Sequence, residues 1–324
     1  MARVPRVSRF EYVVDYLTAV NEGLSSEAIE ERLAKRKTTF ESEKYAALGR
    51  GGPFGAKQKL RLMNAREILK ECKKLCSSLA LTDESSSSVT QHGLELITST
   101  SGNRLSKFMG MMFSTYPILG RLLMALKGAE ENELEFINGR HTGEYRRFRA
   151  MAEGYGLDLD MVTFLSVRDI LWQAGYLNWF AEKRASELWY RVYLTALIRP
   201  TQATNECIVS FKEVATAYCV NPNQADPVVF DRAIWEEYLR RTNDVPLRPV
   251  FYAELRTATC TRLRIGDAVF DEHIRRLLGP TSPFNVVWSS GTLPFSKERV
   301  SMLKNVPPKS ADGQYMVYLK IGRR

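Results

Sequence analysis

The stretch best suited to bind a charged ligand is G-R-G-G-P-F-G-A-K-Q-K-L-R, at residues 49–61. Its glycines let the backbone lie close to phosphate groups, because they carry no side chain and tolerate unusual dihedral angles. Four basic side chains accompany them: Arg50, Lys57, Lys59 and Arg61. They precede a long helical pattern, and the N-terminus of a helix itself attracts anions. The chemistry that this stretch predicts is phosphate binding.

A free nucleotide fits the stretch poorly. A nucleotide-binding P-loop needs lysine directly after its last glycine and then a hydroxyl residue that holds magnesium. Here Gly55 is followed by Ala56, Lys57 and Gln58, and no hydrophobic strand precedes the loop. We therefore favour a nucleic-acid backbone over a nucleotide, with a solvated basic loop as the open alternative, and expect no cofactor.

The charge of the whole chain indicates the same kind of partner. The 324 residues carry a formal net charge of +9. Residues 1–80 contain 16 Lys and Arg against 10 Asp and Glu, so a balance of +6 lies in the first quarter of the chain. A basic surface attracts polyanions, of which nucleic acid is the first candidate.

The sequence contains few residue patterns that are typical of catalytic or metal-binding sites. Cys72 and Cys76 lie one helical turn apart but on an apolar stripe, which favours buried thiols over half of a zinc site. None of the three histidines is spaced from a serine or cysteine in a way that indicates a catalytic nucleophile and its base. We predict no enzyme, although a nuclease with an unrecognised site, for instance around Glu41, Glu43 and Lys44, stays open.

The N-terminus resembles no signal peptide, and no segment has the length of apolar sequence that a membrane span needs. Five cysteines without a C-x-x-C pair suggest reduced thiols. We therefore expect a cytoplasmic protein, nucleoid-associated if prokaryotic, that does not bind a membrane.

Apolar residues at helical spacing predict helices over residues 9–21, 25–37, 57–79 and 91–98. Ser8 and Ser25 are candidate caps of the first two helices. Between the last two helices, short strand-like pieces flank a D-E-S-S-S-S turn, which we expect to be flexible.

The segment N-A-R-E-I-L-K-E-C-K-K-L-C-S-S-L-A-L-T-D-E-S-S-S-S-V-T-Q-H-G-L-E-L-I resembles the winged helix-turn-helix superfamily. It shows a recognition-type helix, a β-wing and the sequence V-T-x-x-G-L-x-L-I, with which many such domains end. The departure is the glycine-rich insertion before the helix, where the family has a tight turn. The resemblance implies that the helix enters the major groove and that the wing touches the DNA backbone.

The same order of helices and paired strands recurs along the chain. The resulting expectation is a mainly α fold with small β-wings (α+β), built from tandem winged-helix domains at residues 1–102, 103–200 and 206–324. Residues 199–205 are the predicted linker. Aromatic residues crowd the second unit, and core packing there is favoured over a base-stacking surface.

Carried onto this sequence, the resemblance implies a set of DNA-facing residues. In the first unit they are Arg50, Lys57, Lys59, Arg61, Asn64, Arg66, Lys70 and Lys74. In the second unit the basic cluster is Arg140, Arg146, Arg147 and Arg149, with Lys183 and Arg184 at the wing tip. The presumed recognition helix of the second unit carries only Arg168, so that unit is also a candidate for binding protein. The third unit offers Arg256, Arg262, Arg264, Arg275 and Arg276.

The function expected from these observations is binding of double-stranded DNA, as a regulator or as the target-recognition part of a restriction or defence assembly. The alternative is a winged-helix scaffold that holds protein partners through its second and third units. Steep salt dependence of DNA affinity would separate the two, because phosphate contacts release counterions.

Overall fold

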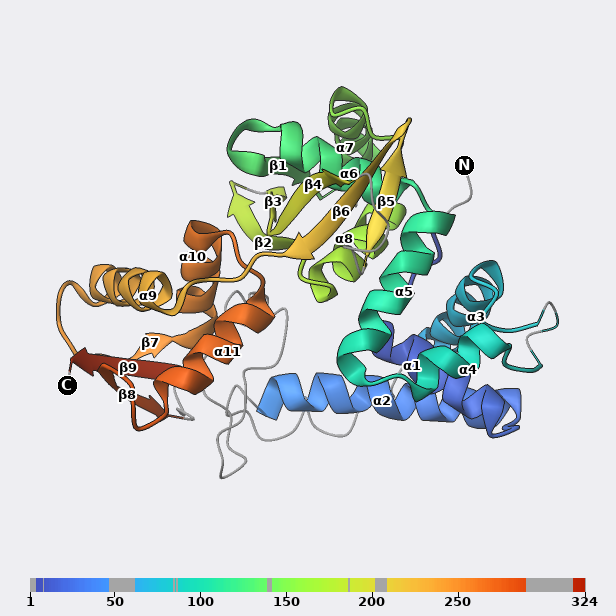
Figure 1. The fold of residues 1–324 in the computed structure, drawn as a ribbon, viewed down its shortest axis with the longest axis horizontal. Coiled ribbons are helices and arrows are strands. Elements are labelled where there is room, and N and C mark those ends of the chain that lie inside the picture. Colours follow the sequence, from blue (N-terminus) through green and yellow to red (C-terminus); the bar gives the residue numbers. More distant parts are fainter. Residues whose placement is uncertain are drawn as a thin grey trace. The chain divides into compact units, whose positions relative to one another are not determined.

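The computed structural model describes residues 4–7, 9–46, 62–83, 85, 87–138, 142–185, 187–201, 209–289 and 317–323 (Figure 1). The chain divides into two compact units. One comprises Met1–Lys37 and Leu60–Pro222, and the other Thr38–Lys59 and Asn223–Arg324. The later segment of the second unit begins at Asn223, and the three domains expected at residues 1–102, 103–200 and 206–324 stay a prediction.

The first unit starts with an array of helices. They are α1 (Phe10–Asn21), α2 (Ser26–Ala46, of which the part up to Lys37 belongs to this unit), α3 (Leu62–Ser78), α4 (Gln91–Thr98), α5 (Ser101–Thr115) and α6 (Ile118–Gly128). The helices predicted at 9–21 and 91–98 are confirmed, the first beginning one residue later. Of the helix predicted at 57–79, residues 62–78 are confirmed and residues 57–61 lie outside the described residues, while α2 continues past the predicted end at residue 37. Ser25 caps α2 as expected, because its Oγ accepts a hydrogen bond from Ala28 N at 3.3 Å.

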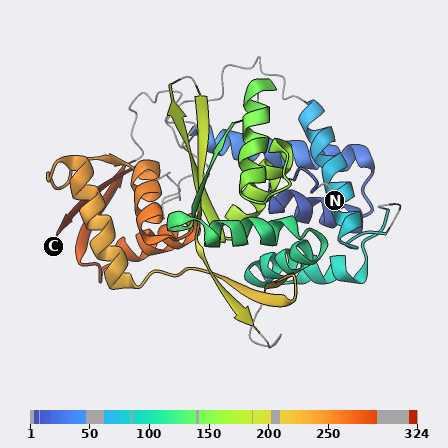
Figure 2. The ribbon, with the colours of Figure 1, turned by 90° about the horizontal axis from the view of Figure 1, so that it is seen from above.

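A three-stranded antiparallel sheet follows, covered by helices. Its elements are η1 (Glu130–Asn132), β1 (Glu133–Ile137), α7 (Thr142–Gly154), α8 (Met161–Gln173), β2 (Leu177–Arg184) and β3 (Glu187–Leu194). The strand order is β1-β3-β2, and the long hairpin β2–β3 is seen from above in Figure 2. Phe136 of β1 packs on Phe148 of α7 and Phe164 of α8, with ring centroids 5.6 and 4.5 Å apart.

The first unit ends in a second small sheet made of β4 (Ala196–Thr201), β5 (Ser210–Glu213) and β6 (Thr216–Pro222), in the order β4-β6-β5. Residues 199–201 were predicted as the start of a linker. They form part of β4 instead, because Arg199, Pro200 and Thr201 pair with Cys219, Tyr218 and Ala217 of β6.

The other unit contains α9 (Pro227–Thr242), β7 (Val250–Phe251), α10 (Tyr252–Leu263), α11 (Asp267–Leu277), β8 (Phe284–Ser289) and β9 (Tyr318–Arg323). Asp226 caps the N-terminus of α9, since its Oδ1 accepts hydrogen bonds from Val228 N and Val229 N. The strand order is β7-β9-β8. Helices α10 and α11 follow one another around Gly266, and β8 pairs antiparallel with β9.

Both units therefore contain the same succession of helix, strand, helix, helix, strand and strand. It runs from α6 to β3 in one unit and from α9 to β9 in the other. In each case the first strand pairs with the third and the third with the second, all antiparallel. A mainly helical α+β chain with small antiparallel sheets is thus confirmed.

Candidate nucleic-acid interface

Helix α3 separates apolar from basic side chains. Ala65, Leu69, Cys72, Leu75 and Cys76 are buried on one side. The opposite side presents a basic stripe, which consists of Arg66, Lys70, Lys73 and Lys74; Lys73 is half-buried and the other three are exposed. Spacings of four and eight residues place Arg66, Lys70 and Lys74 above one another on one helix face.

The basic stripe is only lightly neutralised. Arg66 is 81% exposed, and its Nε lies 3.8 Å from Glu30 Oε2. Lys74 Nζ is 3.2 Å from Glu71 Oε1, and Lys73 Nζ donates to Ser26 Oγ at 3.2 Å. Exposed pairs of this kind contribute about 0–1 kcal/mol, so a phosphate can replace the carboxylate at little cost.

The described residues of the turn after α3 are joined by several hydrogen bonds. Thr82 and Val89 form an antiparallel bridge. Between them the Asp83 carboxylate accepts bonds from the Ser85 and Ser87 hydroxyls and from the backbone of Ser87 and Ser88. Hydrogen bonds, first from Ser85 and then from Ser88 N, hold the pKa of Asp83 well below its usual range. The turn corresponds in position to the predicted wing, and its anionic Asp83 would not favour a phosphate.

The V-T-Q-H-G-L sequence attaches α4 to this turn. Thr90 Oγ1 accepts a hydrogen bond from Gly93 N at 3.2 Å and donates one to Ala80 O at 2.6 Å. A Cβ at Gly93 would collide with the carbonyl oxygen of Leu81 and the side chain of Val89. Glycine is therefore required here by close approach of the backbone.

Five of the predicted DNA-facing residues lie outside the described residues: Arg50, Lys57, Lys59, Arg61 and Arg140. Asn64 lies within α3, but its side chain is outside the described part of the molecule. Their predicted roles stay predictions.

The arginines of α7 differ from one another in their surroundings. Arg146 is exposed. Arg147 bonds to Glu187 of β3 and lies over the Trp189 ring, 5.8 Å from its centroid. Arg149 Nε donates to Glu153 at 2.9 Å, one helical turn away. The latter two charges are already partly offset by carboxylates.

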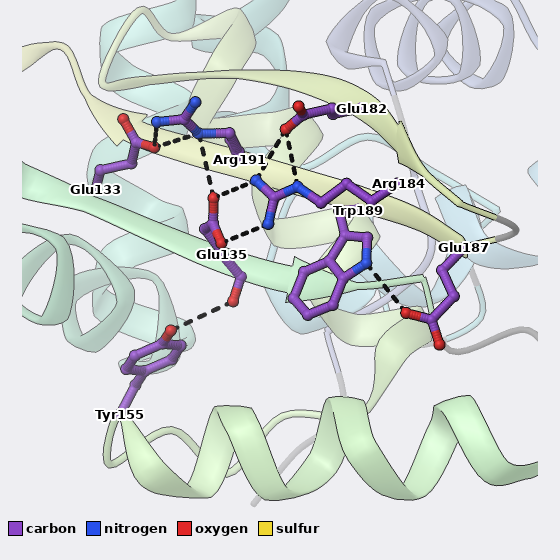
Figure 3. A network of polar contacts seen from close by, with 8 residues as sticks. All are labelled: Glu133, Glu135, Tyr155, Glu182, Arg184, Glu187, Trp189 and Arg191. Carbon is purple, nitrogen blue, oxygen red and sulfur yellow. Dashed lines mark hydrogen bonds and ion pairs between the residues drawn. The ribbon is translucent and has the colours of Figure 1, made fainter.

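The hairpin β2–β3 carries a network of alternating charges (Figure 3). Arg184 donates to both carboxylate oxygens of Glu135, at 2.9 and 2.6 Å, and to Glu182 at 2.8 Å. Arg191 donates to Glu133 at 2.5 Å, and its Nε lies 3.3 Å from Glu135 Oε1. The hydrogen bonds from Arg184 are the main cause that lowers the pKa of Glu135.

This network changes what the predicted wing tip can do. Three carboxylates surround two guanidinium groups, and Arg184 also lies 5.2 Å from the Trp189 ring centroid. The Arg184 guanidinium is thus occupied by Glu135 and Glu182, whereas the neighbouring Lys183 is exposed. Of the two wing-tip residues, Lys183 is therefore the better placed to meet a phosphate.

Helix α8 occupies the position that we expected for a recognition helix, but none of its residues is exposed. Its single arginine, Arg168, is only 5% exposed. The guanidinium lies 3.6 Å from the Trp179 ring centroid and 4.8 Å from that of Tyr190, and it donates to Asp169. Arg168 is thus a packed core residue, and α8 does not present a face to a DNA groove.

In the C-terminal unit, most of the basic residues singled out from the sequence are paired. Arg256 is 1% exposed and lies between Asp267 and Asp271. Arg262 bonds to Glu236 and Arg276 to Asp231. Arg264 ends α10 in the left-handed conformation, and Arg275 is exposed on α11. The charge available to a partner on this unit is therefore smaller than the sequence suggests.

The cysteine predictions are confirmed for the pair on α3. Cys72 and Cys76 are free and fully buried, and burial raises the pKa of both thiols. No group of three or more His, Cys, Asp or Glu side chains within the described ranges could hold a metal ion. The expectation of reduced thiols throughout is wrong at Cys219, which is disulfide-bonded.

Comparison with protein-family models, curated proteins and solved structures finds no match to this chain. Within the described residues, no single helix is long and apolar enough to cross a membrane. Helices α5 and α6 reach the required length and composition only as a pair, and they are bent by 94° relative to each other. The interface that stands out is the basic stripe of α3.

Proposed function

We propose that this protein binds double-stranded DNA and that the basic stripe of α3 is its principal contact. The observation that carries the proposal is the geometry of α3. One side of the helix is anchored in the core by Leu69, Cys72 and Leu75, while Arg66, Lys70 and Lys74 project from the other. A rigid helix with an exposed row of cations suits a groove lined by phosphates.

The arrangement of the remaining elements supports the proposal. The order helix, strand, helix, helix, strand, strand with a first-third-second antiparallel sheet is that of winged-helix domains, and it occurs twice. We therefore propose tandem winged-helix units from α6 to β3 and from α9 to β9. Helices α1 to α5, with the turn 81–90 between α3 and α4, precede them, and α3 supplies the DNA contact. Such a chain would act as a regulator or as the target-recognition part of a larger assembly.

The test is DNA affinity as a function of salt. A variant with Arg66→Gln, Lys70→Gln and Lys74→Gln loses three cations from the stripe. The slope of log affinity against log salt should fall by about two to three units for any duplex sequence, because each phosphate contact contributes about 0.9. Fluorescence anisotropy on a labelled duplex measures both quantities.

The matched control removes the same charge elsewhere, through Lys212→Gln, Arg240→Gln and Arg275→Gln. All three positions are exposed and lie on β5, α9 and α11. The control should keep most of the affinity and of the slope. Equal losses of DNA affinity and of salt slope in the two triple variants would show that only net charge matters. Unchanged DNA binding by the α3 variant would refute the proposed interface.

A second candidate function has a specific observation in its favour. Because α8 has no exposed residue and Arg168 is enclosed by aromatic rings, the unit from α6 to β3 is suited to a scaffold rather than to reading DNA. If the purified protein shows no salt-dependent DNA binding, protein partners held by this unit become the preferred function.

A further inference from the structure

A cleft of about 600 Å³ lies in the first unit between the end of α3, helix α4 and helix α5. Its apolar lining comes mainly from Leu79, Leu96 and Met111. Clefts of this size, with an apolar lining and a few polar groups, are typical of small-molecule sites.

Gly110 of α5 lines the cleft without contributing a side chain. Glycine inside a helix costs about 0.8–1.0 kcal/mol relative to alanine. Neither close packing nor an unusual backbone angle explains it here, because a Cβ at Gly110 would meet no atom within 4 Å and its φ is not positive. The missing side chain instead leaves space in the wall of the cleft.

The polar lining comes from two facing helices. Helix α4 contributes His92 and Glu95, three residues apart and hence on one face. Helix α5 contributes Lys107, together with Ser106 and Ser114, whose hydroxyls donate to the carbonyl oxygens of Gly102 and Gly110. In the described part of the chain neither the His92 nor the Lys107 side chain forms a hydrogen bond or an ion pair, while Glu95 Oε1 accepts one bond from Gln91 at 3.1 Å.

We propose that this cleft binds a small zwitterion with an apolar side chain, of which an apolar amino acid is the simplest. Lys107 would bind the carboxylate and Glu95 the ammonium group, while the apolar side chain lies over Leu79, Leu96 and Met111. A phosphorylated ligand fits less well, since Glu95 would repel a dianion and Lys107 is the single lysine in the lining. The inference does not depend on DNA binding by α3.

Isothermal titration with L-leucine, L-methionine and L-phenylalanine tests the proposal on the full chain. At least one of them should bind with one-to-one stoichiometry. The comparators N-acetyl-L-phenylalanine and L-phenylalaninamide each lack one charge and should bind more weakly than the parent amino acid. Lys107→Gln should weaken binding by about tenfold, the size expected for one charge-assisted hydrogen bond.

Gly110→Leu is the decisive variant, because it places a large apolar side chain in the lining of the cleft, from a Cβ position that meets no atom within 4 Å, and removes a helix-interior glycine. Binding should be lost while the thermal unfolding temperature is maintained or raised. Gly102→Leu is the matched control: it lies in the same helix, meets no atom within 4 Å and does not line the cleft. It should bind as the wild type does.

Three results would overturn the proposal. They are no binding by any of the three amino acids, wild-type affinity in Gly110→Leu, and equal affinity for L-phenylalanine and its two singly charged comparators. The Lys107→Gln variant provides an independent reading if Gly110→Leu does not fold.

Discussion

Arg256 and Asp271 face each other in the interior of the C-terminal unit, with Arg256 Nη1 3.3 Å from Asp271 Oδ1. The same carboxylate accepts a hydrogen bond from the Tyr252 hydroxyl at 2.5 Å, and Asp267 lies 3.9 Å from Arg256 Nε. All four residues are buried. The guanidinium thus ties α10 to α11 and offsets the charge of two buried carboxylates.

Arg256→Ala should therefore destabilise the C-terminal unit by about 3–5 kcal/mol, the usual effect of removing one partner of a buried ion pair. Arg262→Ala is the control on the same helix, since Arg262 pairs with Glu236 at the surface; it should cost about 1 kcal/mol or less. Urea unfolding, with hydrogen exchange of residues 227–277 as the local measurement, compares the two. Similar effects would mean that the buried network contributes little.

His273 should make the stability of the C-terminal unit depend on pH. Its ring stacks on Phe230 with centroids 4.3 Å apart, and burial, followed by the charge of Arg276, lowers the pKa of His273 below 6.5. The unfolded chain then binds a proton that the folded chain resists, so stability falls as pH drops through 6.5 and levels off below the folded pKa.

The comparison variant is His273→Phe, which can retain the stack on Phe230. The stability of the wild type minus that of the variant should decrease from about pH 8 to about pH 5, the range in which histidine titrates. A difference that does not change with pH would contradict the prediction.

Gly93→Ala should disrupt the junction between the turn 81–90 and α4. The added methyl group would collide with the Leu81 carbonyl, which belongs to the backbone and cannot move without breaking the turn. Gly102→Ala meets no atom within 4 Å and should be neutral or stabilising by up to about 1 kcal/mol. Thermal unfolding of the two alanine variants distinguishes them, and equal unfolding temperatures would show that the turn adapts.

The thiols of Cys72 and Cys76 should be unreactive in the native protein. Their burial and the resulting rise in pKa leave almost no thiolate, which is the reactive form. Iodoacetamide should label neither residue before unfolding and both after it, as read by peptide mass spectrometry. Stoichiometric zinc in the purified protein, lost when both cysteines are changed to serine, would be evidence against two simply buried thiols.

The stretch at residues 49–61 should bind a phosphate backbone rather than a free nucleotide. Changing Lys57, Lys59 and Arg61 together to glutamine should weaken binding to all DNA sequences and reduce the salt slope by about two to three units. If affinity and slope stay unchanged, the stretch is a solvated linker. Micromolar binding of ATP by the wild type would instead favour a nucleotide site.

Local patterns in the sequence predicted most elements of this fold. The apolar spacing of Leu69, Cys72 and Cys76 placed the buried side of α3, and Ser25 was a predicted cap of α2, where its Oγ accepts a bond from Ala28 N at 3.3 Å. Such features depend on neighbours within one or two helical turns, so a sequence read alone can locate them.

The charge available at the surface depended instead on contacts between distant residues. Glu135 and Arg184 are 49 positions apart, and only the pairing of β1 and β2 with β3 brings them together. Arg168 is buried because rings from β2 and β3 close over α8. The sequence alone determined where positive residues are concentrated, whereas the tertiary structure decided which of them remain exposed, because neutralisation and burial require partners far away along the chain.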